Sequence, residues 1–162
     1  MPSQPCTPIA AFLQQAIDLA TKNVTSGRGG PFGAVIVRAG EIVATGVNLV
    51  TATNDPTAHA EITAIRRAAA ELGTFSLAGC ELYSSCEPCP MCLAACYWSR
   101  VEAILFGNSA ADAARVGFDD AKLYREVALP LSDRSLPISQ VLGPDAWKSF
   151  AAWQESLIKL DY

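Results

Sequence analysis

The first apolar pattern along the chain has helical spacing. It comprises Ile9, Phe12, Leu13, Ala16, Ile17 and Ala20. This pattern predicts a helix that ends near Ser26, where the glycine-rich stretch 27–31 interrupts it. No Gly-Lys-Ser/Thr follows these glycines, which argues against a phosphate-binding loop. Two short apolar runs, 34–37 and 42–44, flank Ala39-Gly40 and predict the two strands of a hairpin.

The middle of the chain predicts a helix and then a strand–helix–strand unit. Asp55-Pro56 resembles a helix start, and the pattern continues to Gly73, so His59 is expected in the first turn or two. Residues 80–85 and 101–106 read as strands, with an apolar helix over 90–99 between them. Such a short return implies a parallel crossover.

The last third of the chain has weaker patterns. We expect a turn over 117–120, a weak strand over 138–142 and a helix from Asp145 to about Leu160. Together these elements predict the α/β class, as a three-layer α/β/α sandwich around a mixed central sheet of about five strands.

Length and composition favour one folded domain over residues 1–162. Hydrophobic residues make up 51% and charged residues 17% of the chain, which excludes a disordered chain. The net charge of −4 provides no basic surface for a polyanion, so a small-molecule substrate is expected and a nucleic acid is not. Neither a secretion leader nor a long apolar run is present, so we expect a cytoplasmic protein without a membrane partner.

Four of the six cysteines lie within 11 residues, at Cys86, Cys89, Cys92 and Cys96. Without a secretion leader, such crowding indicates metal binding or catalysis. The spacing is similar to that of an iron–sulfur run, but Tyr97 replaces the closing proline and a second run is absent. We therefore favour zinc, and we expect Cys86 and Cys96 to be buried small side chains or neighbours of the ligands.

Two motifs carry the candidate chemistry: His59-Ala60-Glu61 and the run Pro88-Cys89-Pro90-Met91-Cys92. An H-x-E motif followed by P-C-x-x-C is the signature of zinc deaminases. Two cysteines three residues apart at a helix start can face one cation, and His59 supplies a third ligand. Three protein ligands leave a position for water, which zinc activates, while Glu61 moves protons without binding the metal.

A non-catalytic zinc scaffold is the alternative from another class. Structural zinc sites usually have four protein ligands, and Cys86 or Cys96 is available as a fourth. Glu61 would then have no purpose.

Four segments extend the similarity beyond the zinc motifs. They are residues 29–35 (Gly-Gly-Pro-Phe-Gly-Ala-Val), 54–61 (Asn-Asp-Pro-Thr-Ala-His-Ala-Glu), 85–92 (Ser-Cys-Glu-Pro-Cys-Pro-Met-Cys) and 117–120 (Gly-Phe-Asp-Asp). With the terminal Tyr162, they make the chain resemble the bacterial guanine deaminases of the cytidine deaminase-like superfamily. Plant guanosine deaminase shares part of this pattern.

The resemblance implies a five-stranded sheet, one Zn²⁺ per subunit, a role in purine catabolism and a homodimer whose C-terminal segment, about 143–162, is exchanged between subunits. It assigns substrate binding to Phe32, Asn48, Ala60, Trp98, Asp120 and Tyr162. Asn48 would hydrogen-bond the purine base, Phe32 and Trp98 would pack against it, and Tyr162 would close the partner's pocket. Asp120 would also assist Glu61 in catalysis.

The predicted reaction is hydrolytic deamination of guanine to xanthine and ammonia by a zinc-bound hydroxide. Guanosine, cytosine or an aminotriazine is the nearest alternative substrate. A tRNA adenosine substrate fits an acidic chain less well.

Overall fold

The computed structural model describes residues 8–160, and Tyr162 lies outside them. The chain divides into two compact units, one up to Ala121 and one from Lys122 onward. Each unit is described by itself. The single domain with an exchanged C-terminal segment stays a prediction.

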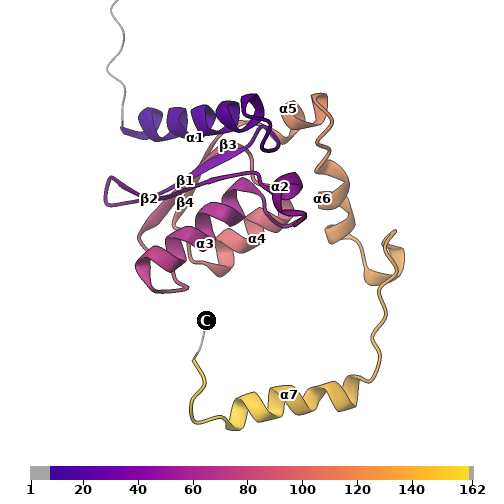
Figure 1. Ribbon diagram of the computed structural model, residues 1–162. Helices are drawn as coiled ribbons and strands as arrows, with labels where there is room; N and C mark the ends of the chain where they lie inside the picture. Colours follow the sequence, from indigo (N-terminus) through magenta and orange to yellow (C-terminus); the bar gives the residue numbers. More distant parts are fainter. Residues whose placement is uncertain (1–7, 161–162) are drawn as a thin grey trace, which may run out of the picture. The chain divides into compact units, whose positions relative to one another are not determined.

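The first unit contains a sheet with the strand order β2-β1-β3-β4 (Figure 1). Its elements are α1 (Pro8–Thr25), β1 (Gly33–Arg38), β2 (Glu41–Val47), α2 (Val50–Thr53), α3 (Ala60–Leu72), β3 (Cys80–Cys86), α4 (Pro90–Trp98), β4 (Ala103–Asn108) and α5 (Ala110–Arg115). Strand β1 pairs antiparallel with β2 and β3, and β3 pairs parallel with β4. The predicted hairpin and the predicted crossover are both confirmed.

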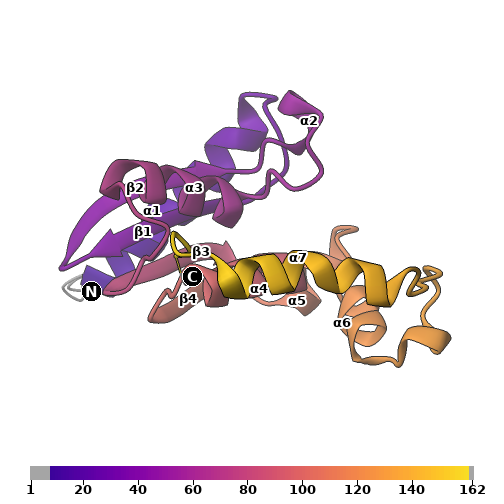
Figure 2. The ribbon, with the colours of Figure 1, turned by 90° about the horizontal axis from the view of Figure 1, so that it is seen from below.

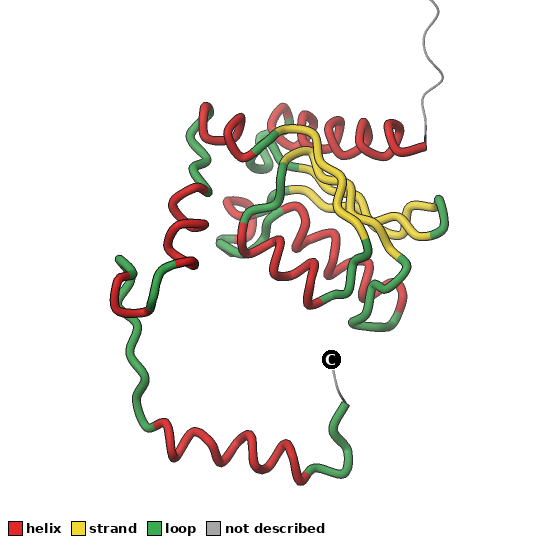
Figure 3. The backbone as a smooth tube through the Cα atoms, turned by 180° about the vertical axis from the view of Figure 1, so that it is seen from behind, coloured by secondary structure: helices red, strands yellow, loops and turns green. Residues whose placement is uncertain are grey.

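Helices cover both faces of this sheet, α1 on one side and α3 with α4 on the other (Figures 2 and 3). Successive side chains of β1 point to opposite faces. Val35 and Val37 pack toward α1 with Ala16, while Ala34 and Ile36 belong to the core beneath α3 and α4. The three-layer α/β/α prediction is therefore confirmed.

Helix α3 lies very close to the edge strand β2 at Gly46. A Cβ atom on Gly46 would clash with the backbone oxygen of Ala60 and the backbone nitrogen of Ala64. Glycine therefore allows the first turns of α3, which carry Glu61, to lie directly on the sheet.

Helix α3 starts later than the sequence predicts. The Asp55 carboxylate accepts hydrogen bonds from the backbone nitrogen and the hydroxyl of Thr57, at 2.8 and 2.6 Å. These bonds close a turn at residues 55–57, and the helix begins at Ala60 with His59 as its N-cap residue. His59 thus lies just before the first turn. The predicted end is confirmed, because Gly73 is the C-cap with a φ of 63°.

The second unit contains α6 (Ala121–Ala128), the 3₁₀ helix η1 (Leu131–Asp133) and α7 (Gly143–Glu155). The weak strand predicted over 138–142 is wrong, because these residues form no strand, so the described sheet has four strands rather than about five. Helix α7 also ends before Leu160. No helix among residues 8–160 combines the length and apolar character needed to cross a membrane.

Candidate metal and substrate site

The predicted site residues gather at one end of the strands, where β1 starts and where β2 and β3 end. Gly33 pairs with Val47, so the start of β1 lies beside the end of β2. Phe32 precedes β1, Asn48 follows β2, and the backbone nitrogen of Asn48 donates a 3.1 Å hydrogen bond to the backbone oxygen of Phe32. Strand β3 is antiparallel to β1 and therefore terminates at the same end of the sheet, where it leads into Cys89.

Three donor atoms meet at this end of the sheet as the motifs predict. The Nδ1 atom of His59 lies 3.6 Å from Sγ of Cys89 and 3.6 Å from Sγ of Cys92, and all three donors lie within 4.8 Å of one another. In a tetrahedral zinc site with ordinary bond lengths, nitrogen and sulfur ligands are about 3.6 Å apart. The donor set and its spacing therefore fit Zn²⁺.

Two helix N-termini carry these donors. His59 is the N-cap residue of α3 and Cys89 is that of α4, and neither side chain makes a capping hydrogen bond. Cys92 follows in the first turn of α4. The partial positive charge at a helix N-terminus favours the thiolate form that binds zinc.

Hydrogen bonds inside the group separate the pKa values of the two thiols. A hydrogen bond from Cys92, assisted by one from His59, lowers the pKa of Cys89. Sharing its proton with Cys89 and being buried raise the pKa of Cys92. The hydrogen bond to Cys89 also raises the pKa of His59. The lowered pKa of Cys89 favours its thiolate, which is the form that binds zinc.

Glu61 lies in the first turn of α3, and only 6% of its surface is exposed. Burial raises the pKa of its carboxyl group to about 7. A carboxyl group that titrates near neutral pH can both accept and donate a proton.

A cavity of about 320 Å³ opens onto the group, a size that suits a small planar molecule. Its lining includes the predicted residues Phe32, Asn48, His59, Glu61, Cys89 and Asp120. Burial raises the pKa of Asp120, and the charge of Cys89 adds to this effect. The carboxyl groups of Glu61 and Asp120, the amide of Asn48 and a metal-binding group thus line one pocket.

Three other predicted residues do not line the cavity. Cys92 and Ala60 are fully buried and are not among the residues that line the cavity. Trp98, the last residue of α4, does not line it either, and 63% of its surface is exposed.

Six lining residues were absent from the predicted set, and Phe118 and Glu87 are two of them. Phe118 packs against Phe32 across the pocket. Glu87 also lines it, and its carboxylate accepts a 2.8 Å hydrogen bond from the backbone nitrogen of Ala110, which holds the start of α5. Both residues lie within segments that carry the family resemblance, and that resemblance was the only sequence feature that could have pointed to them.

The remaining cysteines of the crowded segment are buried thiols outside the donor group. Burial raises the pKa of Cys86 to about 11 and that of Cys96 to about 12. Neutral thiols are poor zinc ligands, because the metal binds thiolates.

Comparisons with known proteins agree with this geometry. Residues 7–108 match the family described as the cytidine and deoxycytidylate deaminase zinc-binding region. The chain is similar to the guanine deaminase of Bacillus subtilis (strain 168), with 50% identity over 151 residues that cover 93% of this chain and 97% of that protein. The X-ray structure of the guanine deaminase from Bacillus subtilis has a TM-score of 0.91 at 49% identity and covers 94% of this chain and 97% of that one.

Two further relatives are less similar. The crystal structure of NE0047 in complex with 2,6-diaminopurine has a TM-score of 0.67 at 34% identity and covers 74% of this chain and 66% of that one. The tRNA-specific adenosine deaminase of Aquifex aeolicus (strain VF5) is 45% identical over 95 residues, which are 59% of this chain and 62% of that protein.

Proposed function

The chain belongs to the family of the cytidine and deoxycytidylate deaminase zinc-binding region, and from that premise we propose that it hydrolyses guanine to xanthine and ammonia. The observation that carries the proposal is a pocket in which the carboxyl groups of Glu61 and Asp120 lie beside a zinc-binding group, in a chain 50% identical to a guanine deaminase over 97% of that protein.

His59, Cys89 and Cys92 would hold the zinc ion. When bound, Zn²⁺ supplies a Lewis acid that makes water reactive at neutral pH. Among the described residues three donors come together rather than four, which supports a catalytic site over a structural scaffold.

Glu61 is the residue that moves protons. Its pKa of about 7 suits a group that accepts a proton from water and then delivers it to the departing nitrogen. The amino group must be protonated because ammonia leaves far more easily than an amide anion. Asp120 assists at a second position of the ring, and its raised pKa supports that role.

Asn48, Phe32 and Phe118 hold the planar base. Asn48 is buried at the pocket edge, and its Oδ1 accepts a 3.3 Å hydrogen bond from the backbone nitrogen of Val50, which orients the amide. The two phenylalanines supply apolar surface for the purine.

We further propose a homodimer in which the C-terminal segment, about 143–162, is exchanged. Helix α7 has aromatic side chains at Trp147, Phe150 and Trp153, and none of its residues is buried. Such exposed apolar surface is typical of an interface. Trp98 and the terminal Tyr162 would then contribute to substrate binding, as the resemblance implies.

We also propose a cytoplasmic location, which the thiol chemistry supports. The five described cysteines are free, and a reducing compartment maintains that state.

Ammonia release from a panel of substrates tests the proposed reaction. Zinc-loaded protein is assayed with guanine, guanosine, cytosine and an aminotriazine, and tRNA is assayed for inosine. We expect kcat/KM for guanine to exceed every other value at least ten-fold. A higher value for another substrate reassigns the substrate, and no ammonia from any of them favours the zinc scaffold.

A further inference from the structure

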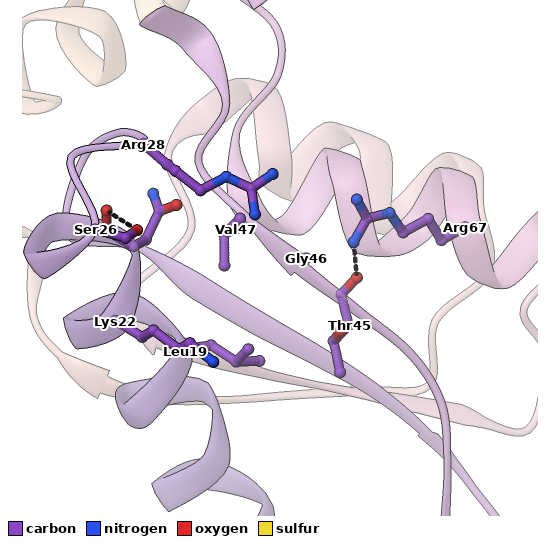
Figure 4. A pocket seen from close by; sticks show the side chains of 9 residues that line it. Leu19, Lys22, Ser26, Arg28, Thr45, Gly46, Val47 and Arg67 are labelled. Atoms are coloured by element: carbon purple, nitrogen blue, oxygen red, sulfur yellow. Dashed lines mark hydrogen bonds between the residues drawn. The ribbon is translucent and has the colours of Figure 1, made fainter. Parts of the chain in front are cut away.

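A second pocket of about 320 Å³ lies along the free edge of the sheet. It is lined by residues of α1, of β2 and of α3, together with the loop that follows α1 (Figure 4). Strand β2 is the outermost strand, so this pocket occupies the gap between the two helix layers beside it. None of the chemistry assigned to the zinc-binding site involves this pocket.

Positive charge is concentrated here. Lys22, Arg28 and Arg67 line the pocket, and none of its nine described lining residues is acidic. None of the three cations forms an ion pair among residues 8–160. The chain as a whole has 12 basic and 16 acidic residues, so three unpaired cations in one pocket depart from the overall charge balance. An anion is the ligand that such a pocket favours.

Two of the three cations also have a role within the fold. Arg67 donates a 2.9 Å hydrogen bond from Nη1 to the backbone oxygen of Thr45 (Figure 4). Lys22 lies in the last turn of α1, where a cation offsets the negative end of the helix dipole. These roles account for two of the cations within the fold, and the exposed guanidinium of Arg28 is available to a ligand.

A buried polar side chain, that of Asn23, forms part of the pocket wall. Asn23 is only 3% exposed, and its Nδ2 donates hydrogen bonds to the backbone oxygens of Asn48 and Gly30, at 2.8 and 2.9 Å. Its Oδ1 has no hydrogen-bond partner among the described residues, although a buried acceptor without a partner destabilises the fold. The two donated hydrogen bonds fix Asn23 in the wall of the pocket.

Apolar surface completes the lining. Leu19 and Val47 are partly buried beside the cations, so the ligand has a non-polar part as well as a charged one. We propose that this pocket binds a small phosphate ester of mononucleotide size, whose phosphate contacts Arg28, Lys22 and Arg67. A long polyanion is disfavoured, because the pocket is small and the chain carries a net charge of −4.

Calorimetric titration of the full chain tests this proposal. The probe is inosine 5′-monophosphate, which has no exocyclic amino group for a deaminase to remove, and inosine and inorganic phosphate are the comparisons. We expect one nucleotide per chain, with inosine and inorganic phosphate each binding at least ten-fold more weakly. Equal binding of inosine, equal binding of inorganic phosphate, or no nucleotide binding would overturn the proposal.

Variants separate this pocket from the zinc-binding one. Arg28→Gln should weaken nucleotide binding at least ten-fold, Arg28→Lys should restore most of it, and Arg38→Gln, an exposed arginine at the far end of β1, should leave it unchanged. Unaltered nucleotide binding by Arg28→Gln would show that the nucleotide binds elsewhere. If tRNA binds more tightly than the nucleotide and loses affinity in Arg28→Gln, the pocket binds a polyanion instead. Either result overturns the proposal. Should Arg28→Gln fail to fold, Lys22→Gln takes its place.

Discussion

Phe118 packs edge to face against Phe32, with ring centroids 4.8 Å apart and an interplanar angle of 85°. Contacts of this kind contribute about 0.5–1.5 kcal/mol beyond the burial of the two rings. Phe118 precedes Asp120 by two residues, and both line the substrate pocket. The contact therefore holds the segment that carries the second carboxylate against the start of β1.

Replacing Phe118 by alanine should loosen that segment. We expect kcat/KM for guanine to fall by about 10- to 100-fold, because small displacements of a reacting group have effects of this size. Zinc content, measured by atomic absorption, should not change. Phe75→Ala is the control, since Phe75 is exposed and is not among the residues that line the pocket. Equal loss in both variants would indicate a general effect of removing a ring.

Glu61→Gln keeps the size of the side chain and removes the titrating group. Positioned proton transfer accounts for about 10²- to 10⁴-fold in rate, so kcat should fall by at least about 10²-fold while zinc stays bound. Steady-state ammonia release and metal analysis of the same preparation check both parts. Full turnover in this variant would remove Glu61 from the mechanism.

Asp120→Asn should lower kcat about 10²-fold or more and leave the metal in place. The neighbouring Asp119 offers a matched control, because its carboxylate accepts a 3.0 Å hydrogen bond from the backbone nitrogen of Ala121 and it is not among the pocket-lining residues. Asp119→Asn should keep nearly all activity. If Asp119→Asn lost more activity than Asp120→Asn, the catalytic role assigned to Asp120 would be wrong.

Cys89→Ala should lose zinc and lower the melting temperature, because metal binding contributes to the free energy of folding. Cys96→Ala removes another buried thiol of α4 that is outside the donor group and should keep one zinc per chain. Metal analysis and thermal unfolding distinguish the two. Stoichiometric zinc in Cys89→Ala would show that the ligand assignment is wrong. Visible absorbance typical of an iron–sulfur cluster in the natural protein would show that the site does not hold zinc.

Phe150→Asp places a charge among the aromatic side chains of α7, where Phe150 is 62% exposed and packs against Trp147. If this surface forms the dimer interface, the variant should sediment as a monomer while the natural chain sediments as a dimer. Ser149→Asp introduces the same charge at the next position and should leave the dimer intact. A monomeric natural chain would contradict the exchange.

Local patterns predicted most of the first unit, because the hairpin, β3, α4 and β4 each have a periodicity that their own residues determine. The start of α3 was misplaced because Asp55-Pro56 has the composition of a helix start, whereas the Asp55 carboxylate is used by Thr57 in a preceding turn. Nothing in the segment 138–142 distinguishes a strand from an irregular segment, since a strand also needs a neighbour to pair with.

The metal-binding group was predictable for a similar reason. His59, Cys89 and Cys92 occur in motifs whose spacing reflects one helix turn, and their geometry agrees with that spacing. Phe118 and Glu87 reach the pocket through contacts with Phe32 and Ala110 that depend on the folded chain. No periodicity encodes such long-range contacts, so sequence reasoning did not include these two residues.

The close approach of α3 to β2 at Gly46 limits how this enzyme can be redesigned. Even a methyl group there would push away the turn that carries Glu61, so the scaffold tolerates little change at a position that does not line the substrate pocket. Engineers who wish to alter the range of accepted bases have freedom in the loops around the pocket, and none at this glycine.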